Sequence, residues 1–295
     1  MPRHLQNYGE NRKMFTILNK VSLAPQVDSI VIEAPYIAKH AKAGNFVVLR
    51  INEKGERIPL TIADSSKTEG TITLLFQKTG KTTEELGMLK PGNVIRDIAG
   101  PLGHDTPMHD YGHCVLVGGG IGSATLYPIL KALKEKNNRV TTILGARTRE
   151  LIIWENRFKE VTDELLLTTD DGSSGRKGLV TEVLKEVIET GDVKLVIAVG
   201  PVRMMQAVSE LTKPFGVKTL VSLNPVMVEG TGMCGACRVN VAGKTRFACV
   251  EGPEFDGHEV DFQGLINRLG FYREEEAQAL DVFRKKKCKG KCKSA

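Results

Sequence analysis

Short runs of apolar and β-branched residues, separated by turn residues, fill the first third of the chain. Five of them occupy residues 15–24, 29–35, 44–51, 71–78 and 93–100. Runs of this length predict strands, and their close succession predicts a small antiparallel β barrel, which we assign to residues 14–103. Residues 1–13 are polar and mixed, and we expect them to form a flexible leader.

The pattern changes after a turn-rich joint at residues 100–103. From His113 to about Val221, strand-length apolar runs alternate with amphipathic runs of helix length at 124–136, 151–161, 180–189 and 203–214. Such alternation requires crossover connections, so it predicts an α/β domain with a doubly wound parallel sheet, over residues 104–222. A cysteine-rich lobe at 223–262 and a helical segment with a basic tail at 263–295 complete the predicted organisation.

Three cysteines in the third lobe have the spacing of iron–sulfur ligands. Cys234 and Cys237 form a CxxC pair, Cys249 follows, and four residues separate Glu229 from Cys234. Plant-type ferredoxins hold a 2Fe-2S cluster with C-x4-C-x2-C…C spacing, and Glu229 occupies the position of the first cysteine. Glycines in this loop allow positive φ angles and a close approach to inorganic sulfide. We therefore predict a 2Fe-2S cluster with these four ligands.

A zinc site is the alternative for the same cysteines. Zinc accepts thiolate and imidazole ligands, so His258 would complete a Cys3His set with the three cysteines. The chain would then be a nucleotide-binding sensor with a zinc interaction module and no enzymatic activity. The iron–sulfur cluster is favoured because the CxxC pair is common to both sites, whereas the upstream ligand position is specific to the cluster.

A glycine-rich turn follows the first strand of the predicted parallel sheet. Its residues are Gly118, Gly119, Gly120, Ile121 and Gly122. Glycines between a strand and a helix let the backbone reach a pyrophosphate, which the N–H groups at the helix start favour. The run lacks the full GxGxxG pattern, so a turn that needs glycine only for packing is the alternative. The alternating strands and helices around it favour a dinucleotide site.

Further candidates follow the carboxyl ends of later strands, where open α/β sheets bind ligands. They are Arg147, Asp170, Gly200 and Pro201. An acidic residue after the second strand would hold a ribose 2′-hydroxyl of NAD(H), and an arginine there would suit the 2′-phosphate of NADP(H). Neither Arg147 nor Arg149 decides between the two cofactors.

Two segments of the predicted barrel are candidate diphosphate sites. In Arg57–Ala63, the guanidinium can clamp a diphosphate and the Thr61 hydroxyl can donate to it. Gly80 precedes Thr82 and Thr83 at the start of a short predicted helix, whose N–H groups attract anions. A surface arginine and a plain helix cap are the alternatives.

Together these segments resemble the ferredoxin–NADP reductase superfamily, in its dihydroorotate dehydrogenase electron-transfer-subunit branch. The strings NPVMVEGTGMCGACR and FACVEGPEFDGHEVDF are similar to the small subunits of NADH-dependent reduced ferredoxin:NADP oxidoreductases. The resemblance covers roughly residues 15–262. The fourth ligand position looks like aspartate in those small subunits and is cysteine in dihydroorotate dehydrogenase relatives. Glu229 therefore departs by one methylene from the former and argues against the latter.

The resemblance implies three cofactors and their binding residues. FAD would bind at Arg57, Pro59, Leu60, Thr61, Ile62, Ala63, Gly80, Thr82 and Thr83. A nicotinamide dinucleotide, NAD(H) rather than NADP(H), would bind at Gly118–Gly122, with Arg147, Asp170, Gly200 and Pro201 beside it. The 2Fe-2S cluster would bind at Glu229, Cys234, Cys237 and Cys249. No catalytic side chain is expected, because the cofactors carry the chemistry.

The resemblance also implies a function and a partner. The chain would exchange a hydride between NAD(H) and FAD and pass single electrons through the cluster. The acceptor would be a larger iron–sulfur flavoprotein resembling a glutamate synthase small subunit. The complex of the two would couple NADH, NADPH and ferredoxin by electron bifurcation, and ferredoxin would be only an indirect partner of this chain. Electron-transfer subunits of dihydroorotate dehydrogenase or of a cytosolic hydrogenase are the alternatives.

Charge and hydropathy exclude other partners. The net charge of +6 comes from the carboxyl-terminal tail, since removing the seven positive charges between residues 284 and 293 leaves −1. The folded body therefore offers no basic face for nucleic acid. No run of eighteen apolar residues and no signal-peptide core occurs in the sequence, so we expect a cytoplasmic protein without a membrane partner.

Overall fold

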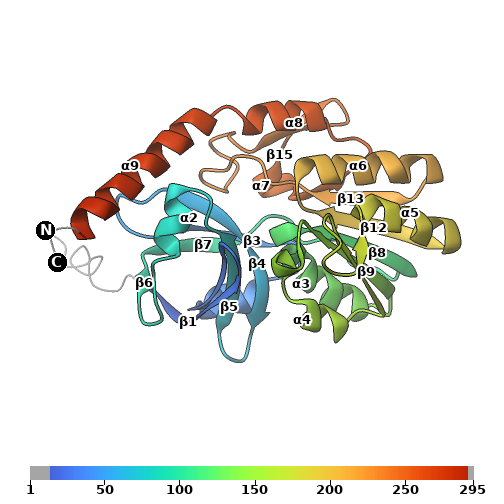
Figure 1. Ribbon diagram of the computed structural model, residues 1–295, viewed down its shortest axis with the longest axis horizontal. Helices are drawn as coiled ribbons and strands as arrows, with labels where there is room; N and C mark the ends of the chain where they lie inside the picture. The colour runs from blue at the N-terminus through green and yellow to red at the C-terminus, as the bar shows by residue number, and fades with distance from the viewer. Residues whose placement is uncertain (1–13, 292–295) are drawn as a thin grey trace, which may run out of the picture.

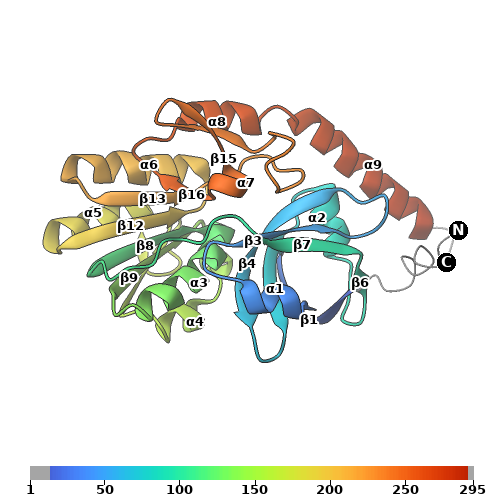
Figure 2. The same cartoon turned by 180° about the vertical axis from the view of Figure 1, so that it is seen from behind.

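The computed structural model describes residues 14–291, with the backbone alone for residues 287–291. The predicted flexible leader lies outside the described residues, as do Cys292 and the side chain of Cys288. The described chain has three parts (Figure 1): a barrel, a parallel sheet flanked by helices, and a smaller lobe that covers one end of both. Figure 2 shows the same arrangement from behind, with the last helix running outside the barrel.

The barrel is a seven-stranded antiparallel sheet in the order β6-β1-β2-β5-β4-β3-β7. Its elements are β1 (Phe15–Ala24), β2 (Val27–Glu33), α1 (Pro35–His40), β3 (Phe46–Arg50), β4 (Arg57–Ser66), β5 (Thr71–Gln77), α2 (Lys81–Leu86), β6 (Val94–Ile95) and β7 (Asp97–Leu102). Alternate residues of these strands are apolar and point inward, as in Ile30, Ile32, Ile72 and Leu74, which form the closed core of the barrel. The predicted fold class of this part is confirmed.

The second sheet has the order β11-β10-β9-β8-β12-β13-β16, and all its pairs except β13 with β16 are parallel. Its strands are β8 (His113–Gly119), β9 (Arg139–Ala146), β10 (Glu164–Thr169), β11 (Arg176–Lys177), β12 (Val193–Val199), β13 (Lys218–Ser222) and β16 (Glu254–Asp256). The chain starts at β8 in the middle of the sheet, runs outward to β11, and then returns across β8 to β12. This is the predicted doubly wound sheet.

Helices cover both faces of the parallel sheet. They are η2 (Gly120–Gly122), α3 (Ser123–Lys134), η3 (Arg149–Leu151), α4 (Glu155–Lys159), α5 (Val180–Thr190), α6 (Val202–Thr212) and η4 (Lys213–Phe215). The single helix predicted at residues 151–161 is wrong in its extent. Trp154 has a φ of 58°, in the left-handed region, so the backbone turns there and only α4 remains as an α-helix.

The third lobe contains β14 (Arg238–Val241), β15 (Lys244–Phe247), α7 (Ala248–Glu251), α8 (Phe262–Leu269) and α9 (Arg273–Lys291). Its apolar residues Val239, Phe262 and Leu265 pack in the same core as Met205 and Val208 of α6. From this lobe α9 crosses to the barrel (Figure 1), where Arg284 forms an ion pair with Glu84 of α2. Among the described residues, no helix is long and apolar enough to span a membrane.

A group of ion pairs joins the barrel to the helices of the parallel sheet. Asp64 of β4 accepts from Lys131 of α3 at 2.6 Å and from Arg157 of α4. The Arg157 guanidinium lies over the rings of Tyr127 and Trp154, at 4.5 and 4.3 Å from their centroids. Burial raises the pKa of Asp64, but the two cations outweigh it and hold the pKa below its ordinary value.

Replacing Asp64 with asparagine is expected to lower the free energy of unfolding at pH 7 by about 1–3 kcal/mol, because two partly buried cations lose their counterion. A depressed carboxyl pKa stabilises the fold above the ordinary pKa of aspartate, and that stability is lost as the pH falls through the folded-state value. Urea unfolding at pH 7 and at pH 3 tests this. The difference between Asp64→Asn and the unaltered chain should shrink at the lower pH, and a difference independent of pH would contradict the assignment.

Candidate functional site

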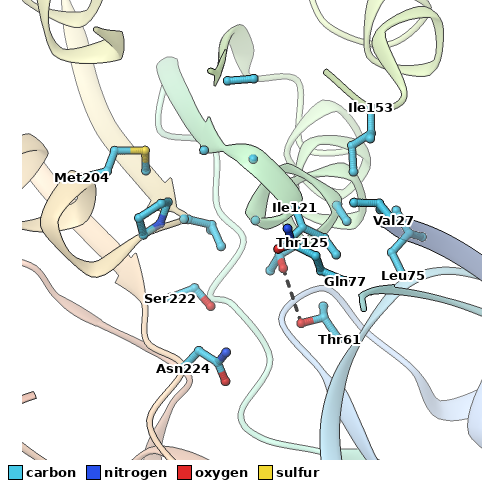
Figure 3. Close-up of a pocket in the computed structure, with 18 of the residues that line it drawn as sticks. Val27, Thr61, Leu75, Gln77, Ile121, Thr125, Ile153, Met204, Ser222 and Asn224 are labelled. Atoms are coloured by element: carbon cyan, nitrogen blue, oxygen red, sulfur yellow. Dashed lines mark hydrogen bonds between the residues drawn. The ribbon is translucent and has the colours of Figure 1, made fainter. Parts of the chain in front are cut away.

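A cavity of about 850 Å³ lies between the barrel and the parallel sheet. Figure 3 shows side chains from both halves converging on it, with Thr61 of the barrel opposite Ser222, the last residue of β13, and Asn224 just after it. The cavity is lined by Val27, Pro59, Leu60, Thr61, Ala63, Leu75, Gln77 and Thr83 of the barrel half, and by Gly119–Gly122, Thr125, Arg147, Asp170, Gly200, Pro201, Met204 and Ser222–Asn224 of the other, among others.

The sheet wall of the cavity consists of strand ends. Parallel strands place their carboxyl ends on one edge, where ligands bind in open α/β sheets. Here β8 supplies the glycine-rich turn, β9 leads to Arg147, β10 to Asp170 and β12 to Gly200. The structure therefore brings together the residues predicted on this side, with the exception of Gly118. A Cβ on Gly118 would lie 3.0 Å from Leu126 of α3 and 3.1 Å from Leu144 of β9, so that glycine serves packing between the sheet and α3.

Glycine is required at two positions of this wall for different reasons. A Cβ on Gly122 would lie 2.7 Å from the Cα of Gly200 and 2.7 Å from the carbonyl oxygen of Val199, so the two turns contact backbone to backbone. Gly120 has a φ of 54° and nothing within 4 Å of its Cβ position. Its backbone is therefore free to face a bound group, while Gly122 holds the turn against β12.

The barrel wall comes from β4 and α2. Pro59, Leu60, Thr61 and Ala63 line the cavity, and the hydroxyls of Thr61 and Thr125 approach to 3.4 Å across the two halves (Figure 3). Thr83, in the first turn of α2, also lines it and accepts from the N–H of Gly80 at 3.0 Å.

Four other residues predicted on the barrel side lie outside this lining. Arg57 is exposed at the start of β4, and Ile62 points into the barrel core, because it alternates with Thr61 and Ala63. Gly80 caps α2. Thr82 is buried and donates to the Glu56 carboxylate at 2.5 Å. This hydrogen bond, opposed by burial and aided by Lys81, lowers the pKa of Glu56.

Sequence reasoning missed several cavity residues. Ser222 and Asn224 follow the same rule of strand carboxyl ends that identified Gly200, so the end of β13 was the signal that should have revealed them. Ile153 and Met204 reach the cavity from segments without a distinguishing pattern. Nothing in the sequence alone marks those two.

The predicted cluster ligands lie in the third lobe. Cys237 and Cys249 are buried, and their Sγ atoms are 3.1 Å apart. Cys234 and Glu229 are exposed on the same loop. Within the part of the chain that the structure describes, no three His, Cys, Asp or Glu side chains converge as a metal site. The four-ligand set stays a prediction, of which the structure places one pair in contact.

The backbone of this loop suits an iron–sulfur cluster bound by buried thiolates. Gly230, Gly232 and Gly235 have φ angles of 78°, 83° and 66°, as the glycine pattern predicts. Burial and the neighbouring Cys237 raise the pKa of Cys249 to about 11, while the Gly232 N–H acts in the opposite direction. A thiolate here therefore needs further positive charge, which iron would provide.

The zinc alternative has a poorer fit. His258 would have to turn to the cysteines, but its Nε2 is 2.9 Å from the Oγ1 of Thr212. Thr212 in turn accepts from Thr219 at 2.6 Å, so the imidazole belongs to a hydrogen-bonded network between α6, β13 and the third lobe. The imidazole is therefore engaged away from the cysteine pair.

Two segments of the chain match known protein families. Residues 116–210 match an oxidoreductase NAD-binding domain, and residues 224–261 match the iron–sulfur cluster binding domain of dihydroorotate dehydrogenase B. The chain is 50% identical over 269 residues to a dihydroorotate dehydrogenase B (NAD(+)) electron transfer subunit homolog of Thermotoga maritima, covering 91% of this chain and 95% of that protein. This chain belongs to the dihydroorotate dehydrogenase B electron transfer subunit family.

A further relative and a solved structure are also similar to this chain over most of its length. A family member from Desulforamulus reducens is 34% identical over 252 residues, which cover 83% of this chain and 96% of that protein. In a solved structure of NADH-dependent reduced ferredoxin-NADP oxidoreductase, reported for flavin-based electron bifurcation, a chain 48% identical superimposes with a TM-score of 0.88. The match covers 93% of this chain and 99% of that one. The resemblance and the electron-transfer function predicted from the sequence are confirmed, and the chain is an oxidoreductase subunit.

Proposed function

We propose that this chain exchanges a hydride between NAD(H) and FAD and sends single electrons through a 2Fe-2S cluster to a larger partner, within an electron-bifurcating oxidoreductase. The observation that carries this proposal is one cavity walled by flavin-barrel strands on one side and nucleotide-binding strand ends on the other. When bound, FAD supplies the conversion between two-electron and one-electron chemistry. The protein has to hold, orient and shield the reacting groups.

The barrel wall suits the flavin. Leu60, Thr61 and Ala63 line the cavity. The two apolar side chains would shield the flavin ring from water, and the Thr61 hydroxyl would hydrogen-bond to it. Thr83 and the first turn of α2 would meet the pyrophosphate. A ferredoxin NADP+ reductase of Neisseria gonorrhoeae with bound FAD and NADP shares the fold at 18% identity and a TM-score of 0.56.

The sheet wall suits a nicotinamide dinucleotide. Gly119–Gly122 would present backbone N–H groups at the start of α3 to its pyrophosphate. Asp170 projects from the end of β10, where its carboxylate would accept from ribose hydroxyls and repel a 2′-phosphate. Arg147 lies on the same rim, but an acidic neighbour favours NAD(H) over NADP(H).

Replacing Asp170 with asparagine is expected to lower kcat/KM for flavin reduction by NADH about tenfold, because a charge-assisted hydrogen bond is lost. The ratio of NADH to NADPH rates should fall at the same time. Stopped-flow reduction of the flavin with each nucleotide measures both. Asp171→Asn is the matched control, because Asp171 accepts from the N–H and hydroxyl of Ser173, at 2.9 and 2.6 Å, and lies outside the cavity lining. Equal losses in the two variants, or faster reduction of the unaltered protein by NADPH, would refute the assignment.

Electrons would leave this chain for its partner protein through the cluster in the cysteine loop. Glu229, Cys234, Cys237 and Cys249 would hold the cluster, with Cys234 on the exposed side of the loop. Met233 and Val250, the neighbours of Cys234 and Cys249 in the sequence, are exposed apolar side chains, with 86% and 38% of their surface exposed. Such a surface suits a protein partner.

We propose a larger iron–sulfur flavoprotein resembling a glutamate synthase small subunit as that partner, with ferredoxin reached through it, in the cytoplasm. Purifying the tagged chain from its native cell, with analysis of flavin, iron and sulfide in the complex, tests the function and the partner together. FAD, a 2Fe-2S cluster and a second iron–sulfur flavoprotein are expected. Co-purification with dihydroorotate dehydrogenase or a hydrogenase, or zinc in place of iron, would refute the proposal.

A further inference from the structure

A carboxyl group lies directly behind the wall of the cavity. Glu254 begins β16 and stands opposite Ser222 of β13 in the antiparallel pair. Opposite residues in such a pair project to the same side of the sheet. Ser222 and Pro253 line the cavity, and Figure 3 shows the Ser222 side chain facing it. The Glu254 carboxyl is therefore one side chain away from the space between the two cofactor walls.

One oxygen of this carboxyl lacks the partner that a buried polar atom normally has. Among the side chains that the structure describes, only four buried nitrogen or oxygen atoms have no hydrogen-bond partner, and Glu254 Oε1 and Thr106 Oγ1 are two of them. The two side chains meet at Gly44 of the barrel, where a Cβ would be 2.5 Å from Thr106 Oγ1 and 2.9 Å from the other carboxyl oxygen, Glu254 Oε2. The barrel, the connection to the second sheet and β16 thus enclose one polar site with unused hydrogen-bonding capacity, which calls for a function.

The surroundings allow this carboxyl to change its protonation near neutral pH. Burial raises the pKa of Glu254 to about 7, although the hydroxyls of Ser222 and Thr106 act in the opposite direction. The charged groups of the neighbouring segments do not compensate for burial. Asp105 pairs with Lys42 at 3.0 Å, and His104 and Asp256 are exposed.

We propose that Glu254 holds a proton for the redox reaction in the cavity, and that the Ser222 hydroxyl relays it. The proposal rests on the proposed function. Hydride transfer from NADH to bound FAD would bring two electrons and one proton to the cavity, and one-electron transfer to the iron–sulfur acceptor would leave that proton behind. The Glu254 carboxylate would take it up through the Ser222 hydroxyl. The balance would be one NADH converted to NAD+, two reduced one-electron acceptors and one proton held at the carboxyl.

The test uses the full chain loaded with FAD and cluster, and compares Glu254→Gln with Asp256→Asn, which removes an exposed carboxylate of the same strand. The flavin midpoint potential is measured against pH by reduction with dithionite, and a reduced-minus-oxidised infrared spectrum records protonated carboxyl groups. The unaltered chain and Asp256→Asn should show a break in the pH profile near pH 7 and a carboxyl signal. Glu254→Gln should lack both.

Ser222→Ala provides a second test if the Glu254 variant does not fold. It keeps the carboxyl, so the break should remain, while the infrared signal of the protonated carboxyl should appear at least about tenfold more slowly during reoxidation by a one-electron acceptor. A pH break or carboxyl signal that persists in Glu254→Gln, or an unchanged rate of carboxyl protonation in Ser222→Ala, would overturn the proposal. A preparation that lacks FAD or cluster, or that NADH does not reduce, would instead refute the proposed function.

Discussion

Replacing Cys249 with alanine is expected to abolish the iron–sulfur cluster while the flavin remains bound. The Cys249 thiol is buried in contact with Cys237, and it faces the Gly232 N–H. A 2Fe-2S cluster needs four protein ligands, and without Cys249 only Glu229, Cys234 and Cys237 of the predicted set remain. Iron and acid-labile sulfide should fall to background, the visible spectrum should reduce to that of a flavin, and NADH should still reduce that flavin.

Cys114→Ala is the matched control. Cys114 is also a buried free thiol, in the core beneath α3, and burial raises its pKa to about 12, so it is an unreactive packing residue. Its replacement removes the same atoms and should leave the iron content unchanged. Loss of iron in both variants would show that the cysteine pair acts through folding, and retention of iron in Cys249→Ala would refute its assignment as a ligand.

Replacing Gly122 with alanine is expected to slow flavin reduction by NADH at least about 100-fold, because small displacements of a binding turn have effects of this size. The added methyl group would meet the backbone of Gly200 and Val199 at 2.7 Å, and backbone has no free rotamer to move aside. The two turns must separate, which displaces the N–H groups that face the dinucleotide. Reduction of the same flavin by dithionite should be unaffected, since it does not require the nucleotide site.

Gly216→Ala controls for general destabilisation. Gly216 has a φ of 65° and open space at its Cβ position, so alanine there costs backbone strain of about 1 kcal/mol far from the cavity. Thermal unfolding of both variants and stopped-flow reduction by NADH measure the two effects separately. Normal NADH kinetics in Gly122→Ala would show that this turn takes no part in nucleotide binding.

The sequence predicted the architecture well because each element carries its own period. Apolar residues repeat every two positions in the strands that carry Ile30 and Ile72, and about every 3.6 positions in the helices between the parallel strands. Both repeats can be recognised locally in the sequence. The rule that ligands meet strand carboxyl ends placed Asp170 and Gly200 on the cavity. The same rule extends to Ser222, which was overlooked at the end of the last parallel strand.

The errors occur where side-chain direction or long-range contact decides the outcome. A contiguous motif such as Arg57–Ala63 suggests a continuous binding surface, yet strand alternation turns Ile62 into the barrel core. Thr82 is engaged by Glu56, a residue 26 positions away. Gly44 and Thr106 contact the Glu254 carboxyl, and no local pattern in the sequence indicates that these segments meet.

The shared core of the third lobe and the parallel sheet bears on how such chains can be recombined. Val239, Phe262 and Leu265 pack in one core with Met205 and Val208 of α6, so part of the apolar surface that buries the lobe belongs to the neighbouring domain. A chimera joined at the start of the cysteine lobe would pair that surface with a foreign helix. If the lobe is transferred together with α6 and β13, the contact between them is kept. The smallest segment that can be exchanged between such proteins therefore includes these two elements.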